Sequence, residues 1–188
     1  MTAAFYEIRL ALAGAMMLAR GDPGGLVWFD GSIDGFWRSF RAALICYPLF
    51  LVLLTFRIKA EQVAASSIER IVAVETIGFA IAWVAFPLLI LPLTRLLDRE
   101  NRFLLFMVAY NWSQVPQTML FVLIGIVGAA LPTGLAEVVA VAGGIAVLVY
   151  EWFIARTALN IPGAPATLVV LIDLLLGSVL SRVTEGLY

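Results

Sequence analysis

The sequence predicts an all-α membrane protein: a polytopic bundle of five transmembrane helices behind an N-terminal amphipathic helix. Apolar residues make up 63% of the 188 residues and charged residues only 13%, whereas soluble domains are roughly 45–50% apolar and about 25% charged. The mean hydropathy of +1.02 agrees with this composition. The chain also contains five apolar runs that reach or approach the roughly 20 residues needed to cross a bilayer.

Residues 1–30 are expected to lie on the membrane surface rather than to cross it. The apolar stretch at residues 10–19 is too short to span a bilayer. The side chains near one stripe of this helix are apolar: Phe5, Ile8, Leu12 and Met16. The run Gly21-Asp22-Pro23-Gly24-Gly25 follows, and it predicts a turn that ends the helix.

Aromatic residues surround the entry to the first span. Trp28, Phe29 and Trp37 are the ones that we expect to dock at the interface, where aromatic rings are enriched. Ser32 or Asp34 is expected to cap the first transmembrane helix.

The five expected spans are residues 36–56, 71–93, 103–131, 136–158 and 166–183. The connections between them are short, so no segment can hold a separate soluble domain. We therefore expect residues 31–188 to form one transmembrane domain.

The basic residues predict the orientation, because cytoplasmic loops carry an excess of lysine and arginine. The side that holds the N-terminus has eight of the 12 basic residues: Arg9, Arg20, Arg38, Arg41, Arg95, Arg99, Arg102 and Arg156. The opposite side has four: Arg57, Lys59, Arg70 and Arg182. This asymmetry places the N-terminus in the cytoplasm and the C-terminus outside.

Small residues recur at one-turn spacing in spans two to five. The pairs are Gly78 with Ala82, Gly125 with Ala129, Ala140 with Gly144, and Gly177 with Ser181. Such pairs let helix backbones approach closely in lipid. They predict packing between helices of one chain, with a homodimer face as the alternative.

The third span carries polar side chains in the run from Tyr110 to Thr118. Asn111, Gln114 and Thr118 share one helical stripe, while Tyr110, Ser113 and Gln117 share the neighbouring one. Pro116 is expected to kink this helix, because it removes a backbone donor. This face must point into the bundle, since amides facing lipid would be unpaired.

Two further carboxylic acids are expected at the same depth. Asn111, Glu151 and Asp173 each lie seven or eight residues from the cytoplasmic end of their span, which places them about 12 Å deep. The predicted intramembrane polar cluster is Tyr110, Asn111, Gln114, Gln117, Glu151 and Asp173. Arg156 is near enough in sequence to bend toward Glu151. The cluster is interpreted either as a structural knot that fixes helix register, or as a proton or substrate site.

Motifs for catalysis are absent from the sequence. The chain has no histidine and one cysteine, Cys46, which excludes histidine-based metal sites, imidazole catalysis and internal disulfides. There is no phosphate-binding glycine loop or nucleophile elbow. We expect no catalytic residues, no metal and no cofactor, and thus no enzyme. The net charge of -1 also argues against nucleic acid as a partner.

The topology resembles that of the bacterial Yip1-domain membrane proteins over residues 36–185. The polar helix around Pro116 is similar to that family's proline-bearing helix, and the stretch from Trp152 to Leu159 with residues 164–177 resembles its closing pair of spans. The resemblance implies a fold rather than a reaction.

Two functions are compatible with these features. The first is a non-enzymatic scaffold or accessory subunit, whose partners are the lipid bilayer and other membrane subunits or a second copy of the chain. The alternative is a small transporter or channel that uses the polar cluster in the cytoplasmic half of the bilayer.

Overall fold

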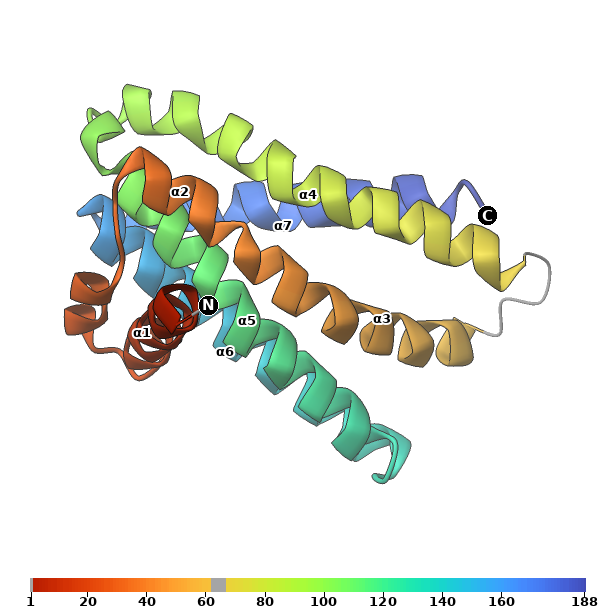
Figure 1. Ribbon diagram of the computed structural model, residues 1–188. Helices are drawn as coiled ribbons and strands as arrows, with labels where there is room; N and C mark the ends of the chain where they lie inside the picture. The colour runs from red at the N-terminus through yellow and green to blue at the C-terminus, as the bar shows by residue number, and fades with distance from the viewer. Residues whose placement is uncertain (1, 62–66) are drawn as a thin grey trace.

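The computed structural model describes residues 2–61 and 67–188, and every regular element in them is helical (Figure 1). Residues 62–66 of the expected external loop, and the side chain of Lys59, lie outside the described part. The elements are α1 (Thr2–Ala19), the 3-10 helix η1 (Pro23–Trp28), α2 (Ile33–Ser39), α3 (Arg41–Glu61), α4 (Ile68–Leu96), the 3-10 helix η2 (Glu100–Arg102), α5 (Phe103–Gly128), α6 (Thr133–Leu159) and α7 (Gly163–Glu185).

Four helical segments are long and apolar enough to cross a membrane, which is what a multi-pass membrane protein requires. They are Ile33–Ile58, Ile68–Leu96, Thr133–Leu159 and Gly163–Glu185. The central helix α5 has 26 residues, but its polar run lowers its hydropathy and it is not among the four. The all-helical fold is therefore confirmed, and the four apolar segments are compatible with a multi-pass membrane protein.

Local signals set several helix ends as the sequence predicts. Gly21 has a φ of +77°, a left-handed conformation that favours glycine, and it follows the end of α1. Ser32 caps α2 by accepting a hydrogen bond from the Gly35 amide. The first expected span is not one helix, because the chain breaks at Phe40 between α2 and α3.

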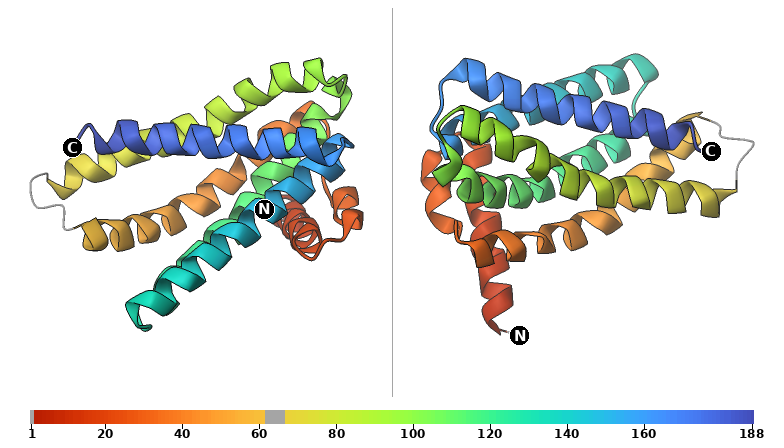
Figure 2. Two further views of the ribbon diagram at one scale, coloured as in Figure 1. Left: turned by 180° about the vertical axis from the view of Figure 1, so that it is seen from behind. Right: turned by 90° about the horizontal axis from the view of Figure 1, so that it is seen from above.

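Helix α5 lies at the centre and packs against α1, α2, α3 and α6. Helix α7 packs instead against α4 and α6. In Figures 1 and 2 the α5–α6 hairpin and α7 diverge from the region where α6 ends and α7 begins. The bundle is thus open between α7 and the α5–α6 hairpin.

The predicted small-residue pairs fall into two groups. Gly78 and Gly125 lie at close helix contacts: a Cβ on Gly78 would be 2.7 Å from Thr184 Cγ2 of α7, and one on Gly125 would be 2.7 Å from Phe56 of α3. Gly144 and Gly177 have open space where a Cβ would be. The prediction of packing is confirmed for the first two and wrong for the second two, which face a groove.

Helix α1 runs across the long helices (Figure 2, right). Its buried side chains Ala11, Ala15 and Leu18 pack on the bundle, while Phe5 and Met16 of the predicted apolar stripe are exposed. The Tyr150 hydroxyl of α6 donates a hydrogen bond of 2.6 Å to the Ala15 carbonyl. These contacts attach α1 to the bundle.

Ion pairs also attach α1 to the entry of the first span. Glu7 contacts Arg38 at 2.8 Å and Arg41 at 3.2 Å. Arg38 contacts Asp30 as well. The pKa of Asp30 is lowered, chiefly by hydrogen bonds from Ser32 and also by the Arg38 charge.

A polar cluster joins three helices at the opposite end. The buried Glu75 carboxylate of α4 pairs with Arg57 of α3 and accepts a hydrogen bond of 2.9 Å from the Tyr188 hydroxyl. Arg57 also lies 3.9 Å from Glu185 of α7. The interaction connects the end of α7 to α3 and α4.

Candidate functional site

The polar side chains of α5 are distributed among the helices that surround it. Tyr110 donates a hydrogen bond of 2.7 Å to Asp173 of α7, and the Asn111 amide donates one of 2.8 Å to Ser39 of α2. The Ser113 hydroxyl is hydrogen-bonded at 2.9 Å to the Tyr150 hydroxyl of α6. Each bond satisfies a polar group that would be costly to bury alone. One polar run thereby fixes α5 against three neighbours.

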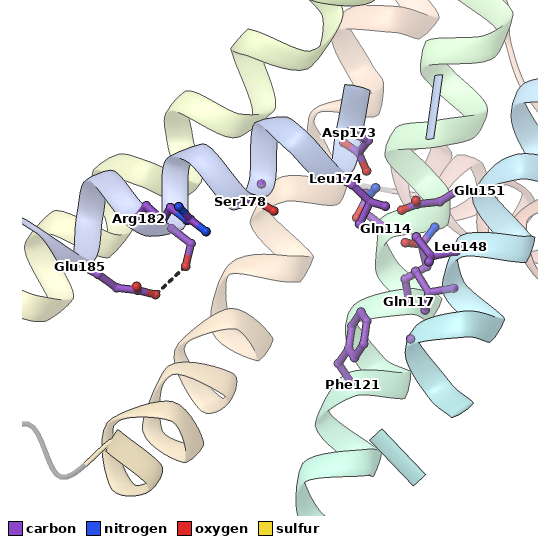
Figure 3. Close-up of a pocket in the computed structure, with 14 residues that line it drawn as sticks. Gln114, Gln117, Phe121, Leu148, Glu151, Asp173, Leu174, Ser178, Arg182 and Glu185 are labelled. Carbon is purple, nitrogen blue, oxygen red and sulfur yellow. Dashed lines mark hydrogen bonds between the residues drawn. The ribbon is translucent and has the colours of Figure 1, made fainter. Parts of the chain in front are cut away.

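Two carboxylic acids meet beside Tyr110. Glu151 of α6 is buried, and its carboxyl group lies beside that of Asp173 at one end of a groove (Figure 3). Two carboxylates that lie side by side repel each other, and a proton shared between them relieves this repulsion. We call Glu151 and Asp173 the acid pair. The Tyr110 hydroxyl is hydrogen-bonded to Asp173 of this pair.

The acid pair has no basic partner among the side chains that the structure describes. The ion pairs there involve other carboxylates. Arg156, which the sequence placed within reach of Glu151, is exposed and lies over the Trp152 ring at 5.2 Å. The reason is the helical angle, since five residues on α6 turn Arg156 away from the Glu151 face. That interpretation is corrected.

The acid pair lies at one end of an open groove of about 700 Å³ between α7 and the α5–α6 hairpin. Figure 3 shows Asp173, Glu151 and Gln114 gathered at this end, with Ser178, Arg182 and Glu185 following along α7. Residues 173, 177, 181 and 185 line the groove at four-residue spacing and thus share one face of α7. A polar path therefore leads from the acid pair to the end of α7.

Gln114 and Gln117 present amide groups to this groove. Gln117 is only 4% exposed, and its amide nitrogen has no hydrogen-bond partner in the part of the chain that is described. Such a donor is costly to bury unless something accepts from it. The groove thus contains an unused donor next to two acids.

Beyond the acid pair, toward the end of α6, the side chains are tightly packed. Ala155, Ala158 and Ala166 have no exposed surface, and Phe106 has almost none. They belong to the core in which α5, α6 and α7 meet. The acid pair is thus open to the groove and is covered by this packing toward the end of α6.

The predicted docking residues are placed differently from one another. Trp37 is 66% exposed and Trp28 is 44% exposed, whereas Phe29 is buried against α1. Trp28 and Trp37 are available at the surface, and Phe29 instead holds η1 on the bundle. Because Phe29 is buried, it is not available as the docking residue that the sequence predicted.

Several residues of the site were missed at the level of sequence. The hydroxyls of Ser39, Tyr150, Ser178 and Ser181 were not among the predicted site residues. Of these, only Ser181 could have been indicated, by the four-residue spacing of positions 173, 177, 181 and 185 on α7. In residues 2–61 and 67–188 no group of three or more histidine, cysteine, aspartate or glutamate side chains could hold a metal ion.

No family model, no curated protein and no solved structure matches this chain. The resemblance to the Yip1-domain family accordingly stays a prediction, and the function is argued from the site.

Proposed function

We propose that this protein is a small membrane transporter that binds its substrate at the acid pair and couples substrate movement to protons. The observation that carries the proposal is the position of Glu151 and Asp173 side by side at the head of a polar groove, with no basic partner among the described side chains. Ionisable groups at membrane depth are costly and commonly mark ion or substrate paths.

The bilayer topology of this proposal has five spans. Helix α5 is 26 residues long, or about 39 Å at 1.5 Å per residue, which suffices to cross the hydrocarbon. Its polar side chains are directed at α2, α6 and α7, so its composition is compatible with a buried central span. Helix α1 lies at the cytoplasmic interface, and the C-terminus lies outside, in a bacterial inner membrane.

Labelling tests this topology. Cys46, the single cysteine of the chain, is buried, so Cys46→Ala gives a background for single-cysteine variants. Leu187→Cys should react with an impermeant maleimide added to intact cells, whereas Arg20→Cys should react only after lysis. The reverse pattern, or labelling of both from one side, contradicts the topology.

Transport follows from a change of access around the acid pair. While the groove is open, Glu151 and Asp173 share a proton. A substrate that reaches them along the groove displaces this proton and is bound in its place. Movement of α7 relative to the α5–α6 hairpin then changes which side is open. Tyr110 provides the polar link of α7 to α5, so this movement requires that hydrogen bond to break or rearrange.

Proton flux in proteoliposomes tests the proposal. Vesicles that contain a pH-sensitive dye and an imposed proton gradient are exposed to separate pools of small cations, anions, zwitterions and sugars. We expect at least one pool to collapse the gradient with the wild type and none to do so with Asp173→Asn. Glu137→Gln, which removes an exposed carboxylate of α6 outside this groove, is the matched control and should retain flux. Absence of flux with every pool overturns the proposal.

A scaffold is the second candidate, and exposed apolar side chains near the N-terminus favour it. Val27 is 86% exposed, Ile33 64% and Trp37 66%. Such a surface is suited to a partner subunit as well as to lipid. Purification of the tagged chain in mild detergent distinguishes the two: a stoichiometric partner lost in Trp37→Ser supports the scaffold, and a lone monomer contradicts it.

A further inference from the structure

A second cavity lies on the other side of Asp173, between α4, α5 and α7. Its volume is about 210 Å³. The cavity shares Gln114, Asp173 and Gly177 with the groove, so the two spaces meet at the acid pair. A ligand that reaches Asp173 along the groove therefore has this cavity next to it.

Aromatic rings form one wall of the cavity. Phe86 and Tyr110 stack with their centroids 4.2 Å apart and an interplanar angle of 24°, and both line the cavity together with Trp83. The Trp83 ring packs against the rings of Phe40 and Phe79, and the ring centroids are 6.3 Å and 6.0 Å apart. Faces of aromatic rings attract organic cations, tryptophan most strongly.

Polar side chains form the opposite wall, and Asp173 gives this wall its negative charge. Asp173 is the only charged side chain that lines the cavity among the described residues, and Asn111 and Gln114 are amides. The Gln114 side chain has no hydrogen-bond partner in the described part of the chain, and Gln117 in the adjoining groove has an unpartnered amide nitrogen. An acid, three aromatic rings and the Gln114 amide surround one small space.

We infer that this cavity binds a small organic ammonium cation, which is the substrate class of the transporter proposed above and rests on that proposal. The cation would lie against Trp83 and Phe86, with Asp173 as its counter-ion. Anions are excluded because the cavity has no basic side chain in the described chain. Drug-sized ligands occupy roughly 300–1,000 Å³, so the volume favours a cation of a few carbon atoms.

Binding of the cation exchanges it for the proton of the acid pair. One positive charge enters and one proton leaves, so the charge of the site is conserved. The titratable groups that face Asp173 are Tyr110 of α5 and Glu151 of α6, and α4 presents only apolar and aromatic side chains to the cavity. Affinity should therefore rise by up to about tenfold per pH unit while one proton is released.

Calorimetry on the full chain in detergent tests this inference, with tetramethylammonium and ethylammonium as probes. Titration in two buffers of different ionisation enthalpy reports the number of protons released. We expect wild-type protein to bind at least one probe with proton release, and Asp173→Asn and Trp83→Leu each to lose at least about tenfold in affinity. Glu137→Gln and Trp37→Leu remove a carboxylate and an indole ring from exposed positions. Both variants should bind the probes as the wild-type protein does.

The outcomes separate this inference from the transport proposal. No binding of either cation by folded wild-type protein, or unchanged affinity in Asp173→Asn, overturns the ammonium site. Flux driven by anions or sugars alone also overturns it, while the transporter stands. Cation binding without flux in proteoliposomes supports the site and overturns transport. Gel filtration and helical circular dichroism show that each variant is folded, and Trp83→Phe, which keeps a ring, should recover part of the affinity.

Discussion

The Tyr110 hydroxyl donates a hydrogen bond of 2.7 Å to Oδ1 of Asp173, and this bond links the central helix α5 to α7. Asp173 also pairs with Glu151 of α6. Three helices thus meet through two acids and one phenol, while the groove and the cavity open on either side. The bond lies where α7 must move if access to the acid pair is to change.

Tyr110→Phe removes this bond and keeps the ring that stacks on Phe86. We expect proton-coupled flux to fall about tenfold, because a hydrogen bond to an acid of this kind contributes about 1.5 kcal/mol. Flux assays in proteoliposomes measure the effect. Tyr47→Phe is the control, since it removes a hydroxyl that bonds to Thr76 at 3.0 Å away from the acids. Equal flux in both variants contradicts a role for Tyr110.

Gly177→Leu should block the groove without harming the fold. A Cβ at Gly177 meets nothing within 4 Å, and leucine favours a helix over glycine by about 1 kcal/mol. We expect an unchanged or higher unfolding midpoint in detergent together with loss of flux and of cation binding. Gly134→Leu, at an open position of α6 outside this groove, should stabilise to a similar degree and retain both. Flux in Gly177→Leu would show that the groove is not the path.

The glycines show how far sequence spacing determines structure. Gly78 and Gly177 occur in equivalent small-residue pairs, yet one contacts Thr184 and the other faces open space. Spacing identifies a face of a helix, but the identity of the opposing helix depends on how the whole bundle packs. Helix positions could be predicted because hydropathy is a property of each segment alone.

Glu151 and Asp173 likewise separate what the sequence predicts from what depends on the packing of the bundle. Depth in the bilayer placed Glu151 and Asp173 at one level, and in the structure both line the same end of the groove. Depth did not indicate that Asn111 would bond to Ser39 of α2 rather than to the acids. The groove could not be predicted either, because it results from the divergence of α7 from α5 and α6.

Gly78→Ala should destabilise the contact between α4 and α7. The added methyl group would lie 2.7 Å from Thr184 Cγ2, and overpacking of this kind costs about 1–3 kcal/mol. Thr184→Ser removes that methyl group and keeps the hydroxyl, so the double variant should recover most of the loss. Thermal unfolding in detergent measures each step. Equal destabilisation of the single and double variants would place the strain elsewhere.

The cluster at the end of α7 should weaken at alkaline pH. Burial, together with the hydrogen bond donated to Glu75, raises the pKa of Tyr188 from 10.0 to about 12. The folded chain therefore favours the protonated phenol, and this stabilisation is complete below pH 10.0 and is lost as pH rises to about 12. The difference in phenolate absorbance between wild type and Tyr188→Phe reports this titration. A midpoint near pH 10.0 would show that Tyr188 does not hold Glu75 in solution.

Ser39→Ala should cost more than the loss of one hydroxyl, because the Asn111 amide is buried and bonds to it. A buried donor without a partner costs about 1–3 kcal/mol, whereas removal of both partners can be nearly neutral. We therefore expect Ser39→Ala to lower the unfolding midpoint and the double variant with Asn111→Leu to recover it. Thr55→Ala is the control, since its hydroxyl is exposed and bonds within its own helix. An additive double variant would show that the two residues act independently, and that α2 is held against α5 by apolar contacts alone.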